Sequence, residues 1–205
     1  DVLEIQRVRV PALYDPLYIK PAPLVPRNLR FEVDERMTPS GEVLTPLNEA
    51  DVMWAVERIR ESSVEAVAVC FLHSYANADH EAAVGKILRR ELPDHYISLS
   101  IDVLPQKLEY ERTSTTVINS YVGPPVTAYL RSMLDQLADA DMHGRLMVMQ
   151  SNGGILDAES VIDKPAQIIE CGPAAGVIGA EHVAALSGFD NVITLDMGGT
   201  TAKAS

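Results

Sequence analysis

The feature that most constrains the fold is a short apolar run at residues 64–71, VEAVAVCF, which only Glu65 interrupts. Such a run is typical of a strand buried on both faces, as in a parallel sheet covered by helices. A helix capped by Asn48 precedes it, and a second helix at residues 79–92 leads to a second strand at 96–100. Parallel strands require such helical crossovers. The order therefore predicts an α/β fold with a parallel strand pair.

The N-terminal part, up to residue 46, differs in composition from this α/β pattern. Five prolines between residues 11 and 26 predict extended segments, because proline removes a backbone donor and disfavours helix in the residue before it. Alternation at residues 29–37, a Thr-Pro-Ser-Gly turn and a short segment at 42–44 predict a β-hairpin.

The C-terminal part is predicted to mix helices with short strands. A Gly-Pro-Pro sequence at residues 123–125 divides one long helical pattern into two predicted helices. A glycine-rich segment opens the last helix, with Pro173 expected at its first position. Helices are predicted at 109–121, 124–140, 158–162 and about 172–187, and strands at 145–150, 166–170 and 192–196.

Composition argues against two classes of partner. The net charge of −12 disfavours a nucleic-acid surface, which requires clustered cations. Membrane insertion is not expected either, because no apolar run approaches the roughly 20 residues that span a bilayer.

The two cysteines, Cys70 and Cys171, lie far apart in the sequence and form no metal or redox spacing, which fits a reduced, cytoplasmic compartment. The chain begins at Asp1 and stops at Ser205, so we expect a piece of a longer polypeptide.

The strand at residues 192–196 runs into a turn suited to phosphates. Gly198 and Gly199 lack Cβ atoms, so backbone N–H groups can approach an anion closely. Thr200 and Thr201 add hydroxyl donors. Asp196, at the end of the strand, can hold a hydrated Mg²⁺ that neutralises phosphate charge. The sequence ends before any return strand is expected to pair with this strand.

Two other glycine-containing segments lie upstream. Residues 172–176, GPAAG, open a helix whose N-terminus favours an anion, although close helix packing is the preferred interpretation for Gly176 and Gly179. Residues 151–154, SNGG, end a strand where α/β sheets bind ligands, but they also fit a simple tight turn. Neither segment alone identifies a ligand.

The remaining polar residues favour ordinary structural roles. The helix start at residues 109–116, EYERTSTT, is most simply a solvated helix face. The five histidines lack metal-ligand spacing, and no G-x-S-x-G elbow marks a serine nucleophile. Cys171 lies at a helix start, where the pKa of a thiol can fall, but no histidine lies near it in the sequence.

Four ordered motifs resemble one family. They are EYERTSTT at 109–116, QSNGG at 150–154, GPAAGV at 172–177 and DMGGTT at 196–201. Together they resemble the hydantoinase A and 5-oxoprolinase family, whose relatives include acetone and acetophenone carboxylase subunits. The segment AVAVCFLHSY at 66–75 is also similar to the family.

The resemblance implies a fold from the actin, sugar-kinase and heat-shock ATPase superfamily, in which two ribonuclease-H-like lobes close on ATP and Mg²⁺. DMGGTT would be the second phosphate turn, and the helix at about 172–187 would connect the lobes. Residues 1–46 would form an extended segment and hairpin, 47–190 the α/β region of lobe one, and 191–205 the truncated opening of lobe two.

The resemblance also implies roles for particular residues. Asp196 would orient Mg²⁺ through water or assist the attacking group, and Glu111, Arg112 and Asn152 are candidate substrate contacts. Many family members read DMGGTSTD where this chain has Ala202 and Lys203, which leaves the subfamily and its substrate open. The residues implied to cradle phosphate are Gly198, Gly199, Thr200, Thr201, Gly172, Pro173 and Ala174.

The implied activity is ATP-dependent hydrolysis of a cyclic amide, with phosphorylation of its carbonyl oxygen. One alternative is a subunit of an ATP-dependent ketone carboxylase, and another is a non-catalytic module of an actin-like ATPase. The implied partners are a small-molecule substrate, the rest of the parent chain and a hydantoinase B-type subunit. Without that parent chain, we expect little ATPase activity.

Overall fold

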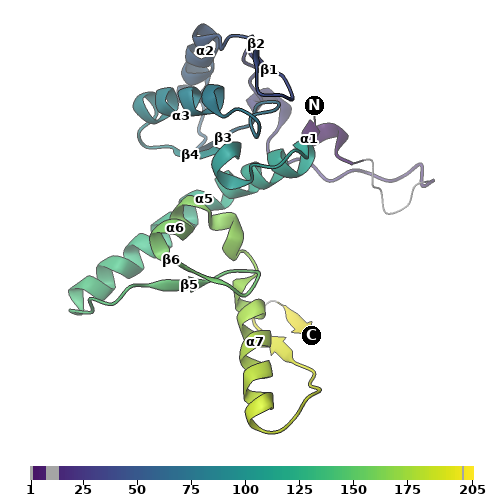
Figure 1. The fold of residues 1–205 in the computed structure, drawn as a ribbon, viewed down its shortest axis with the longest axis vertical. Helices are drawn as coiled ribbons and strands as arrows, with labels where there is room; N and C mark the ends of the chain where they lie inside the picture. Colours follow the sequence, from purple (N-terminus) through teal and green to yellow (C-terminus); the bar gives the residue numbers. More distant parts are fainter. Residues whose placement is uncertain (1, 8–13, 200) are drawn as a thin grey trace. The chain divides into compact units, whose positions relative to one another are not determined.

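The computed structural model describes residues 2–7, 14–199 and 201–205. The chain divides into two compact units, Asp1–Pro124 and Pro125–Ser205 (Figure 1). Each unit combines helices with small two-stranded sheets, so the predicted mixed α/β class is confirmed. The division falls inside one helix, between two neighbouring prolines.

A β-hairpin near the N-terminus is confirmed, although its first strand is shorter than predicted. β1 (Arg36–Met37) pairs antiparallel with β2 (Val43–Thr45). Residues 29–35 are not a strand, because only residues 36 and 37 have β2 beside them. Gly41 in the turn has a φ of 86°, a conformation that glycine adopts freely. Two short helical segments precede the hairpin, α1 (Val2–Ile5) and η1 (Arg27–Leu29).

Two parallel strands form the centre of the first unit. β3 (Ala66–Val69) pairs in parallel with β4 (Tyr96–Leu99) over its whole length. The crossover between them is α3 (Asp79–Glu91), and α2 (Glu49–Arg60) precedes β3. The predicted cap of α2 is also present, since the Asn48 side chain accepts a hydrogen bond from a backbone N–H of the first turn. Both helices, both strands and their parallel pairing are confirmed.

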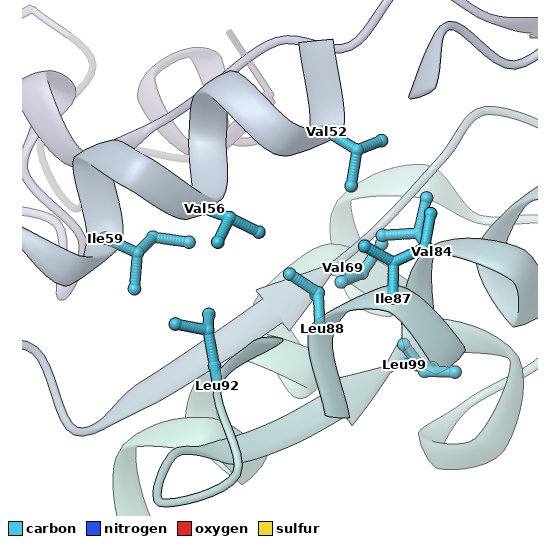
Figure 2. Close-up of a cluster of buried hydrophobic side chains, with 9 residues drawn as sticks. All are labelled: Val52, Val56, Ile59, Val69, Val84, Ile87, Leu88, Leu92 and Leu99. Carbon is cyan, nitrogen blue, oxygen red and sulfur yellow. The ribbon is translucent and has the colours of Figure 1, made fainter. Parts of the chain in front are cut away.

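The hydrophobic core of the first unit lies between α2, α3 and the two strands (Figure 2). Along β3, however, residues 66–68 are half-buried rather than buried on both faces as predicted. In the described residues β3 pairs with β4 alone, and it borders a cavity of about 640 Å³. The core residues are Val52, Val56, Ile59, Val69, Val84, Ile87, Leu88, Leu92 and Leu99.

A single long helix replaces the two helices predicted around the Gly-Pro-Pro sequence. After the short α4 (Ser100–Val103), α5 runs from Glu109 to Asp139 over 31 residues. Each proline removes one N–H donor but keeps a φ compatible with helix, so the helix continues at the cost of two hydrogen bonds. Gly123 lies against the Tyr96 ring, where an added Cβ would come within 2.4 Å of a ring carbon. The glycine therefore permits close packing and does not end the helix.

A helix that crosses a bilayer must be both long and apolar. Although α5 has 31 residues, neither it nor another helix within residues 2–7, 14–199 and 201–205 has the continuous apolar stretch that crossing a bilayer requires.

In the second unit a hairpin follows the C-terminal part of α5. β5 (Met147–Met149) pairs antiparallel with β6 (Ile155–Asp157) and leads to the predicted helix α6 (Ala158–Asp163). The strand predicted at 166–170 is wrong, because η2 (Pro165–Ile168) occupies this segment as a 3₁₀ helix. Pro165 presets a helical φ at the first position, which favours the turn over an extended strand.

The last three elements include a strand that the sequence did not predict. α7 (Cys171–Leu186) is the expected helix, with Pro173 at its third rather than its first position. β7 (Leu195–Met197) is the expected final strand, although it begins later than predicted. β8 (Ala202–Ala204) pairs antiparallel with it, so the expectation of no return strand is wrong. Three residues after the turn suffice for pairing because the loop is short.

We expect Leu88→Ala to destabilise the first unit by about 2–5 kcal/mol, because it leaves a cavity in the core. Leu88 is 3% exposed between α2, β3 and β4. Trp54, the only tryptophan, lies on α2 beside Phe31, so its fluorescence reports unfolding of this unit during urea titration. Leu44→Ala, at a position 69% exposed, is the matched control. An equal effect of both substitutions would contradict the assigned core.

Candidate functional site

The glycine turn of the DMGGTT motif connects β7 and β8. The Gly198 N–H donates to the Thr201 carbonyl at 2.9 Å, which closes the turn. Gly199 is exposed, and an added Cβ there would meet no atom within 4 Å. Thr200, predicted to contribute a hydroxyl, lies outside the described residues. The described part of the turn is therefore accessible to an anion.

Asp196 lies on β7, directly opposite Lys203 of β8. Asp196 is exposed, so its carboxylate can reach a hydrated cation. Within the described part of the chain, no three His, Cys, Asp or Glu side chains cluster as metal ligands. Magnesium at Asp196 would therefore need water and phosphate oxygens as its other ligands.

The start of α7 offers fewer backbone donors than predicted. Pro173 has no N–H, and the N–H of Ala174 donates to the Glu170 carbonyl at 3.3 Å. Gly172 is exposed, with open space where its Cβ would be. The close-packing interpretation of Gly176 and Gly179 is wrong within the described residues, because an added Cβ at either would also meet open space.

The QSNGG turn is fixed to the segment before α7. The Ser151 N–H and hydroxyl both donate to the Gln167 carbonyl, at 2.8 and 2.9 Å. Asn152, a candidate substrate contact, is exposed, and its side-chain oxygen accepts the Gly154 N–H at 2.9 Å. Gly153 has a φ of 86°, and an added Cβ would lie 2.5 Å from a side-chain carbon of Ile178 on α7. The positive φ favours glycine here, since another residue would be strained in this backbone conformation.

A groove of about 510 Å³ lies between α7 and the β7–β8 hairpin. Pro173, Gly176 and Val177 line it from α7, and Asp196 and Lys203 line it from the hairpin. Of the residues predicted for the phosphate site, Asp196 and Pro173 line this groove. The described residues Gly172, Ala174, Gly198, Gly199 and Thr201 are not among its lining residues. Its other walls are largely apolar, so the two charged side chains define its polar end.

The other two candidate substrate contacts, Glu111 and Arg112, lie on α5 in the first unit. Arg112 is 1% exposed, and its guanidinium donates to the hydroxyls of Ser74 and Ser100. Glu111 is half-buried and forms an ion pair with Arg7. The interpretation of residues 109–116 as a solvated face is therefore wrong. This polar face of α5 is packed inside the unit, where Thr116 is also fully buried.

Glu81 belongs to the same buried polar cluster, and sequence reasoning missed it. Its carboxylate is fully buried and accepts hydrogen bonds from the Phe71 N–H at 2.7 Å, the Ser100 hydroxyl at 2.7 Å and the Ile101 N–H at 3.0 Å. The sequence does contain a signal for this burial, because helical spacing places residue 81 on the same face of α3 as Val84 and Leu88.

Cys70 lines the cavity of about 640 Å³ in the first unit, beside Thr113 and Ser120 of α5. Burial raises the pKa of its thiol to about 11, and the negative charge of Glu81 adds to this rise. A thiol with this pKa stays protonated at neutral pH, which disfavours a nucleophilic role.

Two family models match the chain. One, described as the hydantoinase/oxoprolinase N-terminal region, matches residues 1–92, and the other, described as hydantoinase/oxoprolinase, matches residues 112–205.

Similar proteins point to the same family as the two family models. The chain is 43% identical over its full length to an uncharacterised protein of Methanocaldococcus jannaschii, of which it covers 30%. It is 36% identical over 188 residues to the caprolactamase subunit alpha of Pseudomonas jessenii, covering 92% of this chain and 27% of the relative. It is 34% identical over 175 residues to the 5-oxoprolinase of Saccharomyces cerevisiae, covering 81% and 13%. The chain thus spans less than a third of these relatives.

Two solved structures share the fold. The chain matches the ATP-dependent caprolactamase of Pseudomonas jessenii with a TM-score of 0.77 and 34% identity, over 93% of this chain and 28% of that one. It matches a nucleotide-free acetone carboxylase, from work on ATP-dependent acetone carboxylation, with a TM-score of 0.84 and 28% identity, over 92% and 27%.

We expect Glu81→Gln to lower the free energy of unfolding of the first unit by about 2–3 kcal/mol. The amide NH₂ group would face a donor where the carboxylate now accepts hydrogen bonds. Urea titration followed by Trp54 fluorescence measures the effect, and Glu57→Gln on the exposed side of α2 is the control. A loss no larger than that of the control would show that the buried charge contributes little.

We expect Cys70 to make stability depend on alkaline pH. Its folded pKa of about 11 lies above the ordinary value of 9.0, so between these values the unfolded chain releases the proton while the folded chain keeps it. The contribution is therefore intact below pH 9 and falls as pH rises towards 11, by up to about 1.4 kcal/mol per pH unit. Urea unfolding of Cys70→Ala at pH 8 and 10 should lack this component, whereas Cys171→Ala should retain it. If the free energy of unfolding changed equally between pH 8 and pH 10 in the two variants, the raised pKa of Cys70 would be contradicted.

Proposed function

Because the chain belongs to the hydantoinase/oxoprolinase family, we propose that it forms part of an ATP-dependent enzyme that hydrolyses a cyclic amide. The family resemblance drawn from the four motifs is thereby confirmed. Among its relatives, caprolactamase and 5-oxoprolinase are named for cyclic amides, and the solved caprolactamase is described as ATP-dependent. The observation that carries the proposal is the accessible glycine turn that follows Asp196, a residue that lines one groove together with α7.

In this proposal the turn holds the phosphates of ATP. The N–H group of Gly199 and the hydroxyls of Thr200 and Thr201 would bind phosphate oxygens, with Gly172 at the positive end of α7. Gly198 would leave room for the phosphate, since its own N–H already closes the turn. Asp196 would hold Mg²⁺ through water, which fits a lone, exposed carboxylate. Pro173 and Ala174 would shape the start of α7 rather than donate hydrogen bonds, since one lacks an N–H and the other already uses it.

The proposed chemistry is activation of the amide carbonyl. Its oxygen would attack the γ-phosphorus, and ADP would leave. The carbon bonded to the phosphorylated oxygen would then be more open to attack by water, and hydrolysis would end with cleavage of the C–N bond and release of phosphate. Such a transfer depends on positioning and charge neutralisation more than on covalent help from the protein. Asn152 is the best placed of the three candidate substrate contacts, because its turn is exposed, whereas Arg112 is committed to buried hydroxyls.

We further propose that the parent protein has an actin-like, two-lobe fold. Residues 1–46 would form an N-terminal segment with its hairpin, residues 47–190 the α/β part of lobe one, and residues 191–205 the opening of lobe two. The parallel pair β3–β4 between helices supports the assignment of residues 47–190, and the hairpin β7–β8 after α7 supports that of residues 191–205. α7 would then be the helix that connects the lobes.

An ATP-dependent ketone carboxylase is the second candidate function. It is favoured by 32% identity over 188 residues to the acetophenone carboxylase gamma subunit of Aromatoleum aromaticum, and by the similarity to acetone carboxylase. Either activity would be cytoplasmic, would use the rest of the parent chain and would involve a hydantoinase B-type partner subunit. Turnover of a ketone that requires both bicarbonate and partner subunits would select the carboxylase.

We expect Asp196→Asn in the complete protein to lower ATP turnover with a cyclic amide by at least about 100-fold, because it removes the carboxylate that orients Mg²⁺. Phosphate release measured with caprolactam, hydantoin and oxoproline gives the rate. Asp190→Asn, an exposed position in the loop before β7, is the matched control and should retain activity. Full turnover by Asp196→Asn would rule out both catalytic functions of this turn. No turnover of cyclic amides or ketones by the unmodified complete protein would instead favour the non-catalytic ATPase module.

A further inference from the structure

Three residues link the glycine-containing motifs of the second unit. Ser151 belongs to the QSNGG turn, Glu170 immediately precedes α7, and Lys203 follows the turn of the β7–β8 hairpin. The Glu170 N–H donates to the Ser151 hydroxyl oxygen at 3.2 Å. The Glu170 carboxylate forms an ion pair with the Lys203 ammonium. Glu170 is therefore bonded to both of the other motif segments at once.

Lys203 also stands next to the proposed magnesium carboxylate. It lies directly opposite Asp196 in the β7–β8 ladder, and both side chains line the groove beside α7. Directly opposite residues project from the same face of a hairpin, with Cβ atoms about 4.5–5.5 Å apart. Lys203 thus lies opposite Asp196 in the ladder and joins the hairpin to the segment before α7.

Among the described residues, this ion pair is the one polar side-chain link between the β7–β8 hairpin and the segment before α7. β7 is exposed along its whole length, so apolar packing restrains it weakly. The ion pair is itself partly exposed, with 38% of the Lys203 and 61% of the Glu170 side chain accessible. Partly exposed ion pairs contribute little to overall stability. We therefore expect this ion pair to affect the position of the hairpin more than the free energy of unfolding.

We infer that the Glu170–Lys203 ion pair holds the glycine turn of the β7–β8 hairpin in place at the start of α7, which makes Glu170 and Lys203 positioning residues for ATP. The inference rests on the proposed function, in which that turn binds the phosphates. It gives a role to Lys203, which lies outside the residues that the motif itself assigns to phosphate. Neither residue needs to touch the nucleotide.

A charge swap in the complete protein tests the inference. Lys203→Glu and Glu170→Lys each place like charges together, and we expect each to raise KM for ATP about five- to tenfold while kcat stays within about twofold. The double variant restores an opposite pair and should return KM to within about twofold of the original. Glu181→Lys, at an exposed position on α7, is the matched control and should leave KM unchanged.

Loss of rescue would overturn the inference. If the double variant is as impaired as the worse single variant, Lys203 acts by direct contact and not through Glu170. Amide hydrogen exchange of residues 195–204 in the nucleotide-free protein is an independent readout, expected to be faster in both single variants and restored in the double. Unchanged exchange in the single variants would also overturn it. If the unmodified protein hydrolyses no ATP, the proposed function fails, while exchange still decides whether the pair holds the hairpin.

Discussion

The first unit depends on one buried carboxylate. Glu81 accepts hydrogen bonds from the backbone just after β3 and just after β4, so it joins the carboxyl ends of the two parallel strands. Through the Ser100 hydroxyl it also connects to Arg112 on α5. A buried charge is costly unless such donors surround it, which means that the strand ends and α5 must be in place together.

Elements with a signal contained in one segment could be predicted from the sequence. α2 and α3 carry helical spacing, and Asn48 supplies a recognisable cap. The parallel pairing of β3 and β4 followed from the helix between them. The errors arose where tertiary contacts decide the outcome. α5 continues through Pro124 and Pro125 while Gly123 packs against Tyr96, and no local pattern reveals that ring.

The same distinction applies to the candidate site. Glycines located the three motif segments, two as turns after strands and one as a helix start, because backbone requirements are visible in single residues. The polar face of α5 was misread, since a run of Glu, Arg, Ser and Thr looks the same on a solvated helix as on a buried one. Its partners, Ser74 and Ser100, come from 38 and 12 residues away in the sequence. Only the folded chain reveals such a buried network.

The glycines of the second unit separate into two kinds, and this separation bears on function. Gly153 is favoured by the fold, because its φ is positive and Ile178 occupies the space of a side chain. At Gly172, Gly176 and Gly199 an added Cβ would meet open space, so packing within the described residues does not account for them. Two of these, Gly172 and Gly199, lie at the start of α7 and at the tip of the hairpin. A backbone left open at these two places permits the close approach that phosphate oxygens need, and a side chain there would obstruct it.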